Sequence, residues 1–387
     1  MLERRSKSNK KFMLLSAIGI FMVVDSHTFT AFNILGDFIP YNSFFMPMFV
    51  FISGYFNKVD NTTKLLPFIW KKVKTLLIPY VAISVLAFAL QWLMDLLKTG
   101  EVPSYPPGYL AYMLERVVTV GSPFALITPM WFVITLFSLQ LVYAVLKKFL
   151  YKIWKSYIMI IPFLLLNIFV VYSAHYMVEE ALAVLLLPLK VLFFLPFLEL
   201  GIIYRDYLEK KHTALSGGYK IGIMALMLVI NMIRTVKLPM PYDVATDSLD
   251  DLTGFTSPYL VTPIISALVG IIFWLTFVDL AGKPVYDSRF VNYMSCNTFW
   301  IMGLHIPFFN LLNCIFMGIS ENIVALPYFD SEYFAESEWY YWEISNNIKI
   351  VYVIFGILGP LGIKLIYDLI CSLIGKAINS HKGRQAV

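Results

Sequence analysis

Charged residues are scarce in this chain: they make up 14% of its 387 residues, whereas hydrophobic residues make up 59%. Soluble globular proteins carry roughly a quarter charged residues, because a surface that faces water needs them. The scarcity of charge therefore excludes a soluble enzyme and a disordered chain. The mean hydropathy of +0.72 instead indicates a chain that lies largely in a membrane.

Cysteine is also rare, and the three cysteines (Cys296, Cys314 and Cys371) form no CxxC or CxxH spacing. Such scattered cysteines exclude a disulfide-stapled secreted scaffold and a zinc site, and we expect them to be small packing residues. No His, Asp and Glu cluster has the spacing of metal ligands, so we expect no metal.

Long apolar runs dominate the sequence. Runs of about 18 or more residues can cross a bilayer as helices, whereas the strands of membrane β-barrels are short and alternate in polarity. The pattern predicts a single all-α transmembrane domain over residues 1–387 with ten spans: 12–32, 40–57, 75–97, 129–146, 157–175, 185–204, 221–238, 259–281, 298–318 and 347–375.

The distribution of charge predicts the orientation. Most of the 30 Lys and Arg residues lie before span one or in alternate connecting segments, while Asp and Glu gather in 239–258 and 319–346. Positive charge marks cytoplasmic segments, so both termini should be cytoplasmic. The first apolar run lacks a small-residue cleavage site, and we expect it to be retained as a span rather than removed as a signal peptide.

Ionisable side chains inside spans are candidates for a functional site, because placing them in hydrocarbon is costly. Counted from Phe12, His27 lies roughly 22 Å into a core of about 30 Å, in the outer half. A histidine there can act as a general base or as a nucleophile. It can equally be a neutral histidine that bonds a neighbouring helix.

Two other polar residues have less certain roles. Asp25 is two positions from His27, which places their side chains about 200° apart on a helix, so the two should not pair directly. Asp25 therefore either contacts another helix or belongs to the outer vestibule. His305 lies roughly 10 Å into span nine, and we expect no contact with His27. Lys364 and Asp368 are four residues apart and should neutralise each other.

Six stretches, in order along nearly the whole chain, carry a family resemblance: AIGIFMVVDSHTF, SFFMPMFVFISGYF, KKVKTLLIPY, TPMWFVITLF, FLPFLELGIIY and SCNTFWIMGLHIPFF. They resemble blocks of the acyltransferase family 3 proteins, of which the second and third are the most specific. These are bacterial integral membrane enzymes, chiefly O-acetyltransferases that act on envelope and capsular sugars.

The resemblance implies that His27 is the catalytic base and that acetyl-CoA, entering from the cytoplasm, is the acyl donor. Lys71, Lys72 and Lys74 would then hold the donor phosphates at the inner mouth. The alternative is ordinary cytoplasmic positive charge beside anionic lipid.

Further residues can be assigned in the same way. Ser53, Tyr55 and His305 would line the donor path, although Ser53 and Gly54 suit close helix packing at least as well. Asp25 and Trp131 would belong to the acceptor site, although a tryptophan at a span edge is as often an interfacial anchor. The sequence SEWYYWE in 337–343 can hold a sugar face, but interfacial anchoring is the favoured interpretation.

Two positions depart from the family pattern. Ser16 stands where the family has Arg or Lys, eleven residues before the histidine, and Phe45 stands where many members carry histidine. Eleven residues are three turns plus about 20°, so Ser16 and His27 share a helix face roughly 16 Å apart. A pantetheine arm laid along that face would carry a thioester from the inner mouth to His27.

The sequence thus predicts an acyl-CoA-dependent O-acyltransferase of the bacterial cytoplasmic membrane, which acts on a polysaccharide or lipid-linked sugar. Its partners would be that acceptor, acyl-CoA and membrane lipids, with a homo-oligomer possible and no nucleic acid. The main alternative is a transporter or flippase of a glycan precursor. Such a protein would need internal repeats and a polar path through the bilayer, and the sequence shows no convincing sign of either. A second alternative, suggested by Ser16 and Phe45, is an inactive scaffold.

Overall fold

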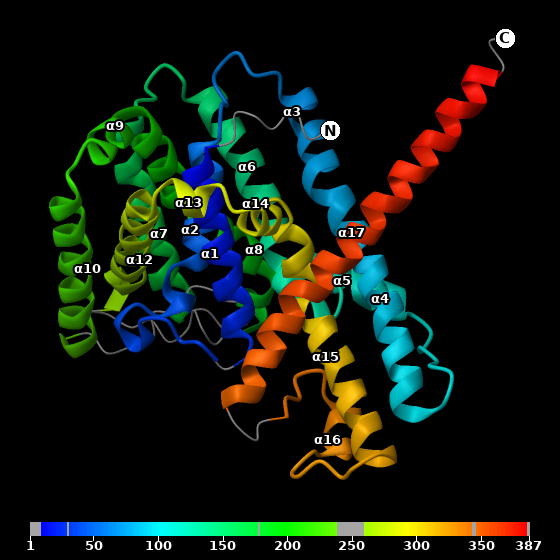
Figure 1. Ribbon diagram of the computed structural model, residues 1–387. Helices are drawn as coiled ribbons and strands as arrows, with labels where there is room; N and C mark the ends of the chain where they lie inside the picture. Colours follow the sequence, from blue (N-terminus) through cyan, green and yellow to red (C-terminus); the bar gives the residue numbers. More distant parts are fainter. Residues whose placement is uncertain (1–8, 29–30, 177–178, 238–258, 343–345, 385–387) are drawn as a thin grey trace.

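The computed structural model describes residues 9–384 apart from 29–30, 177–178, 238–258 and 343–345. Every regular element in those residues is a helix (Figure 1). Eight helical segments are long and apolar enough to cross a membrane. These observations confirm the predicted all-α polytopic membrane protein.

The eight long segments correspond to predicted spans three to ten. They contain α3 (Leu65–Lys72) with α4 (Ile78–Thr99), α6 (Trp131–Phe149), α7 (Ser156–Tyr176), α8 (Glu179–Ile203), α10 (Gly217–Lys237), α12 (Thr262–Ala281), α15 (Thr298–Asn322) and α17 (Asn346–Arg384). Short helices connect them: α5 (Tyr109–Thr119), α9 (Glu209–Thr213), α13 (Lys283–Tyr286), α14 (Arg289–Cys296) and α16 (Ser331–Glu336). A π-helical turn, Val73–Leu77, joins α3 to α4.

The first two helices are shorter than predicted. Helix α1 covers Lys10–Ser26 and α2 covers Phe45–Tyr55, in place of the predicted 12–32 and 40–57. Helix α1 ends early because the Asp25 carboxylate accepts hydrogen bonds from the backbone of the following loop. A 3₁₀ turn at Tyr41–Ser43 precedes α2, and hydropathy does not distinguish apolar 3₁₀ turns from helix.

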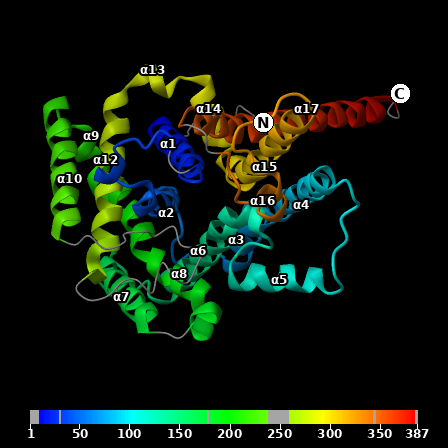
Figure 2. The same ribbon diagram turned by 90° about the horizontal axis from the view of Figure 1, so that it is seen from below.

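Helix α1 lies at the centre of the bundle. It packs against α2 and α12 on one side and against α14 and α15 on the other, and Figure 2 shows it between these two groups. The first turn of α1 and the last turn of α17 lie toward the same end of the molecule (Figure 1). We call that end the inner end, following the predicted orientation, and the opposite end the outer end.

Helices α2 and α8 pack with their backbones almost in contact. A Cβ atom on Gly54 would lie 2.0 Å from the Leu198 carbonyl oxygen, and one on Gly201 would lie 2.1 Å from the Phe51 carbonyl oxygen. Small residues allow this approach between membrane helices. The packing role considered for Gly54 is therefore confirmed.

A buried group of charges, which we call the ion triad, holds the inner end of α1. Lys11 and Lys220 form ion pairs with the two carboxylate oxygens of Asp279 at 2.8 and 2.7 Å. Lys11 also donates a hydrogen bond to the Tyr204 hydroxyl at 2.8 Å. The triad ties α1 to α10 and α12, because buried charges are stable only when they are paired.

Candidate functional site

Two histidines meet at the outer end of α1. His305 Nε2 lies 3.3 Å from His27 Nδ1, and the ring centroids are 4.9 Å apart. His305 is fully buried, whereas His27 is partly exposed. We call these two residues the histidine pair.

Backbone carbonyls determine which nitrogens of the histidine pair carry protons. His27 Nδ1 lies 2.7 Å from the Val23 carbonyl, and His305 Nδ1 lies 2.9 Å from the Ile301 carbonyl. A carbonyl accepts only, so both Nδ1 atoms must donate. In the neutral rings, the single Nδ1 proton of His27 is shared between the Val23 carbonyl and, at the longer distance, His305 Nε2, while His27 Nε2 carries no proton and keeps its lone pair. That lone pair is what a general base requires.

The expectation that His305 would not contact His27 is wrong, and α14 is the reason. Helix α14 precedes α15 and packs beside α1, so α15 begins well inside the bundle rather than at the inner surface. His305 is seven residues after Thr298, where α15 begins, or about 10 Å further along that helix. The two histidines consequently reach the same depth.

The segment 323–342, which we call the outer segment, lies beside α15 at the outer end (Figure 1). Asn310 and Asn313 on α15 donate side-chain hydrogen bonds to the carbonyls of Glu338 and Tyr340, each at 2.8 Å. Tyr340 packs inside the segment, where burial raises the pKa of its hydroxyl, and that hydroxyl accepts a bond from the Asp330 amide. These bonds fix the outer segment to the bundle.

The outer segment places Trp339 against the histidine pair. The Trp339 and His27 rings are 6.2 Å apart between centroids and nearly parallel, at 25°. Sequence reasoning selected SEWYYWE but favoured membrane anchoring. Nothing in the local pattern connects residue 339 to residue 27, because the contact depends on the two asparagines of α15.

Asp25 and Trp131 are both buried. Both Asp25 carboxylate oxygens accept bonds from the Phe32 amide, and one also accepts from the Asn33 amide, so Asp25 shapes the loop after His27. Trp131 is 3% exposed, with Lys190 Nζ 4.0 Å from a ring centroid. Trp131 is therefore not a lipid-facing anchor. A role for either residue in acceptor binding stays a prediction.

The residues predicted to hold the donor separate into different places. Ser53, Lys71 and Lys72 line one cavity of about 300 Å³ near the inner end, where Ser53 accepts a bond from Gln140. Tyr55 faces the other way and bonds Glu209 at 2.9 Å. Lys74 lies over the Trp70 ring, outside that cavity, and His305 is in the histidine pair.

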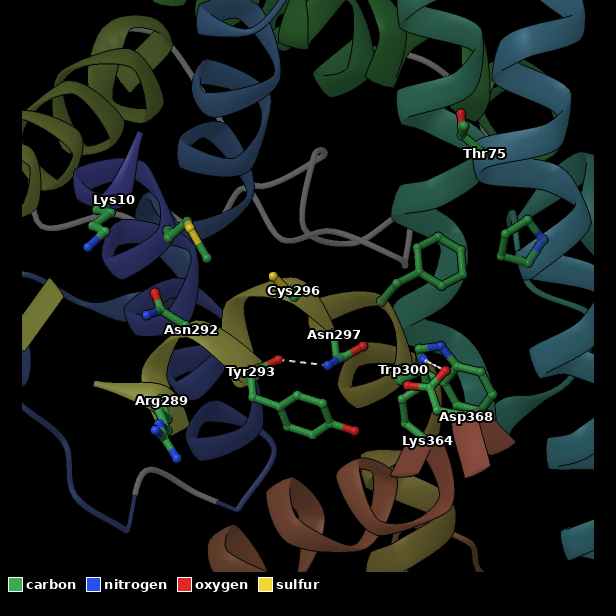
Figure 3. Close-up of a pocket in the computed structure, with 13 residues that line it drawn as sticks. Lys10, Thr75, Arg289, Asn292, Tyr293, Cys296, Asn297, Trp300, Lys364 and Asp368 are labelled. Atoms are coloured by element: carbon green, nitrogen blue, oxygen red, sulfur yellow. Dashed lines mark hydrogen bonds and ion pairs between the residues drawn. The ribbon is translucent and has the colours of Figure 1, made fainter. Parts of the chain in front are cut away.

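A second and larger cavity, of about 690 Å³, opens among α1, α14, α15 and α17 (Figure 3). We call it the inner cavity. Three cationic side chains and several aromatic rings and amides line it, among them Lys10, Arg289, Tyr293, Asn297, Trp300 and Lys364. Lys364 pairs with Asp368, as predicted, and its ammonium lies 5.8 Å from the Trp300 ring centroid.

The inner cavity and the histidine pair share a face of α1. Met13 lines the cavity, and Met13 and His27 are 14 residues apart, about four turns less 40°. Ser16, on the same face, is partly exposed in the folded protein. Phe45, the other departure from the family pattern, is 1% exposed in the core.

Comparison with known proteins agrees with this architecture. The sequence model of a family described as an acyltransferase domain (Acyl_transf_3) matches residues 12–359. No curated protein and no solved structure gives a significant match. The matched range contains both histidines, the outer segment and most of the inner cavity. This chain therefore belongs to the acyltransferase 3 family and is a membrane acyltransferase.

Proposed function

We propose that this protein transfers an acyl group, in the simplest case acetyl, from cytoplasmic acyl-CoA to a hydroxyl group of a cell-envelope glycan or lipid-linked sugar. The membrane would be the bacterial cytoplasmic membrane. The observation that carries the proposal is the histidine pair: a partly exposed imidazole with its tautomer fixed, backed by a second, buried imidazole.

His27 Nε2 removes the proton from the acceptor hydroxyl as its oxygen attacks the thioester carbonyl carbon. The carbon–sulfur bond then breaks, and His27 returns the proton to the departing thiolate. His305 Nε2 accepts from His27 Nδ1 throughout, which stabilises the imidazolium that forms between the two steps. General base catalysis of this kind accelerates reactions by about 10² to 10⁴.

The inner cavity fits the nucleotide end of the donor. Acyl-CoA carries phosphates and an adenine ring, which basic side chains and aromatic rings recognise. Lys10 is paired with Asp287 and Lys364 with Asp368, whereas Arg289 forms no ion pair with any described residue. Arg289 is therefore the cation best placed to meet a phosphate.

The cavity of Lys71 and Lys72 is the competing location. It is less than half as large, and it is lined by residues of α2, α3, α6 and the loop between α2 and α3, with none from α1. The face of α1 that joins Met13 to His27 favours the inner cavity, because the acyl arm then follows a single helix. Ile20 and Val23 on that face are buried, so the arm requires neighbouring side chains to move.

The central test uses purified protein and radiolabelled acetyl-CoA with envelope glycan. We expect His27→Ala to lower acyl transfer by about 10² to 10⁴ while labelled acetyl-CoA still binds. Acyl transfer within a few-fold of the unmodified protein would remove the mechanism. Label trapped covalently on His27 would instead identify it as a nucleophile.

A second test locates the donor. Arg289→Gln should weaken acetyl-CoA binding more than Lys71→Gln or Lys72→Gln. Of these three residues, Arg289 is the one that lines the inner cavity. The reverse order would assign the donor phosphates to the lysine cavity, as the sequence alone suggested.

A further inference from the structure

The aromatic residues of the outer segment differ in what they contact. Tyr340 and Trp342 are 6% and 7% exposed, and the Trp342 indole N–H donates to the Pro327 carbonyl at 2.8 Å. Trp339 is 38% exposed, and its indole N–H bonds no described residue. Trp342 therefore holds the segment together, whereas Trp339 leaves an indole face and a donor available.

The available part of Trp339 lies at the proposed reaction centre. Its ring is nearly parallel to that of His27, whose ring also contacts that of His305. An acceptor that brings a hydroxyl to His27 therefore comes within reach of this indole. The outer segment holds the indole in position through Asn310 and Asn313, so no large movement is needed to present it.

We propose that Trp339 is an acceptor-binding residue, which receives the apolar face of a saturated, hydroxyl-bearing ring and directs one of its hydroxyls to His27. This proposal rests on the proposed function. Tryptophan suits the task because it offers a large apolar face together with one hydrogen-bond donor. The indole N–H would donate to an oxygen of the ring substituents.

The placement also separates the two substrates. Trp339 belongs to the outer segment, while the inner cavity lies at the opposite end of α1. Loss of the indole should therefore weaken the acceptor and leave the donor unaffected. A purely structural role would lower the folded fraction and affect both substrates alike.

The experiment compares Trp339→Ala and Trp339→Phe with a matched control, Trp342→Phe. Purified protein in detergent receives radiolabelled acetyl-CoA with methyl glycosides of several hexoses as ring acceptors and sorbitol as an open-chain polyol. We expect Trp339→Ala to raise KM for the ring acceptors at least tenfold, and Trp339→Phe to give an intermediate value. The KM for acetyl-CoA should stay unchanged.

The control and the remaining outcomes make the result decisive. Trp342→Phe should reduce the amount of folded protein but leave the acceptor KM of the surviving fraction unchanged. Equal acceptor KM in Trp339→Ala and the unmodified protein would overturn the proposal, as would an equal change for rings and sorbitol. If the unmodified protein neither binds nor consumes acetyl-CoA, the proposed function fails first, and the two failures are thereby distinguished.

Protection of His27 provides a second readout that needs no turnover. Diethyl pyrocarbonate acylates accessible neutral imidazoles, and Trp339→Ala should increase its rate of reaction at His27. Methyl glycosides should slow that reaction in the unmodified protein and lose this effect in Trp339→Ala. Protection that is the same in both proteins would contradict acceptor binding by Trp339.

Discussion

The two ends of α1 are buried by different means. At the inner end Lys11 and Lys220 are both held by ion pairs with Asp279. At the outer end His27 contacts a second imidazole, and both rings can be neutral. A charged group held in such a triad stabilises the fold, whereas a neutral histidine pair can gain and release a proton. The comparison assigns stability to the inner end and chemistry to the outer end.

The largest effect on this comparison should come from the ion triad. Asp279→Ala leaves two lysine charges buried without their carboxylate, and breaking a buried pair destabilises by about 3–5 kcal/mol. We expect most of the folded protein to be lost, as measured by thermal unfolding in detergent. Asp287→Ala is the control, because its pair with Lys10 is more than half exposed and is worth at most about 1 kcal/mol. An equal loss in both variants would contradict a special role for the triad.

The next effect concerns the outer end. His305→Phe keeps a ring beside His27 but removes the acceptor nitrogen. A hydrogen bond to a charged group contributes about 1.5–3 kcal/mol, so acyl transfer should fall roughly ten- to a hundredfold per folded molecule. The control is His212→Gln, because His212 is a structural histidine that bonds Tyr204 and Thr276 at the inner end. An unchanged rate in His305→Phe would show that His27 acts without its partner.

A smaller effect is expected at the inner cavity. Lys364→Gln breaks an i,i+4 pair with Asp368, and such pairs contribute about 0.2–0.5 kcal/mol. Thermal stability should therefore barely change. The KM for acetyl-CoA should rise, since Lys364 lines the cavity beside Trp300. A change in stability without a change in KM would argue that the cavity does not bind the donor.

The sequence predicted the long helices well, because each is a continuous apolar run and the structure confirms eight of them. It predicted α1 and α2 poorly. The hydropathy of residues 27–32 and 40–44 resembles that of a helix, but α1 ends before the loop that the Asp25 carboxylate holds, and a 3₁₀ turn precedes α2. Such features depend on hydrogen bonds rather than on composition.

The candidate site was predicted only in part. His27 could be selected from its position, since a titratable ring in the outer half of a span is rare. Its contact with His305 could not be predicted, because the depth of α15 depends on α14 packing beside α1. The contact of Trp339 with His27 could not be predicted for a similar reason, and Lys11 and Lys220 were counted among the cytoplasmic positive charges although both are buried.

The account's central claim is that an acyl donor bound at the inner end reacts at His27 near the outer end. Sealed membrane vesicles of known orientation test this directly, when radiolabelled acetyl-CoA is supplied to one face only. The account predicts labelled glycan when the donor reaches the face that holds Lys10 and Arg289, and none with His27→Ala. Equal labelling from either face, or labelling that persists in His27→Ala, would contradict it.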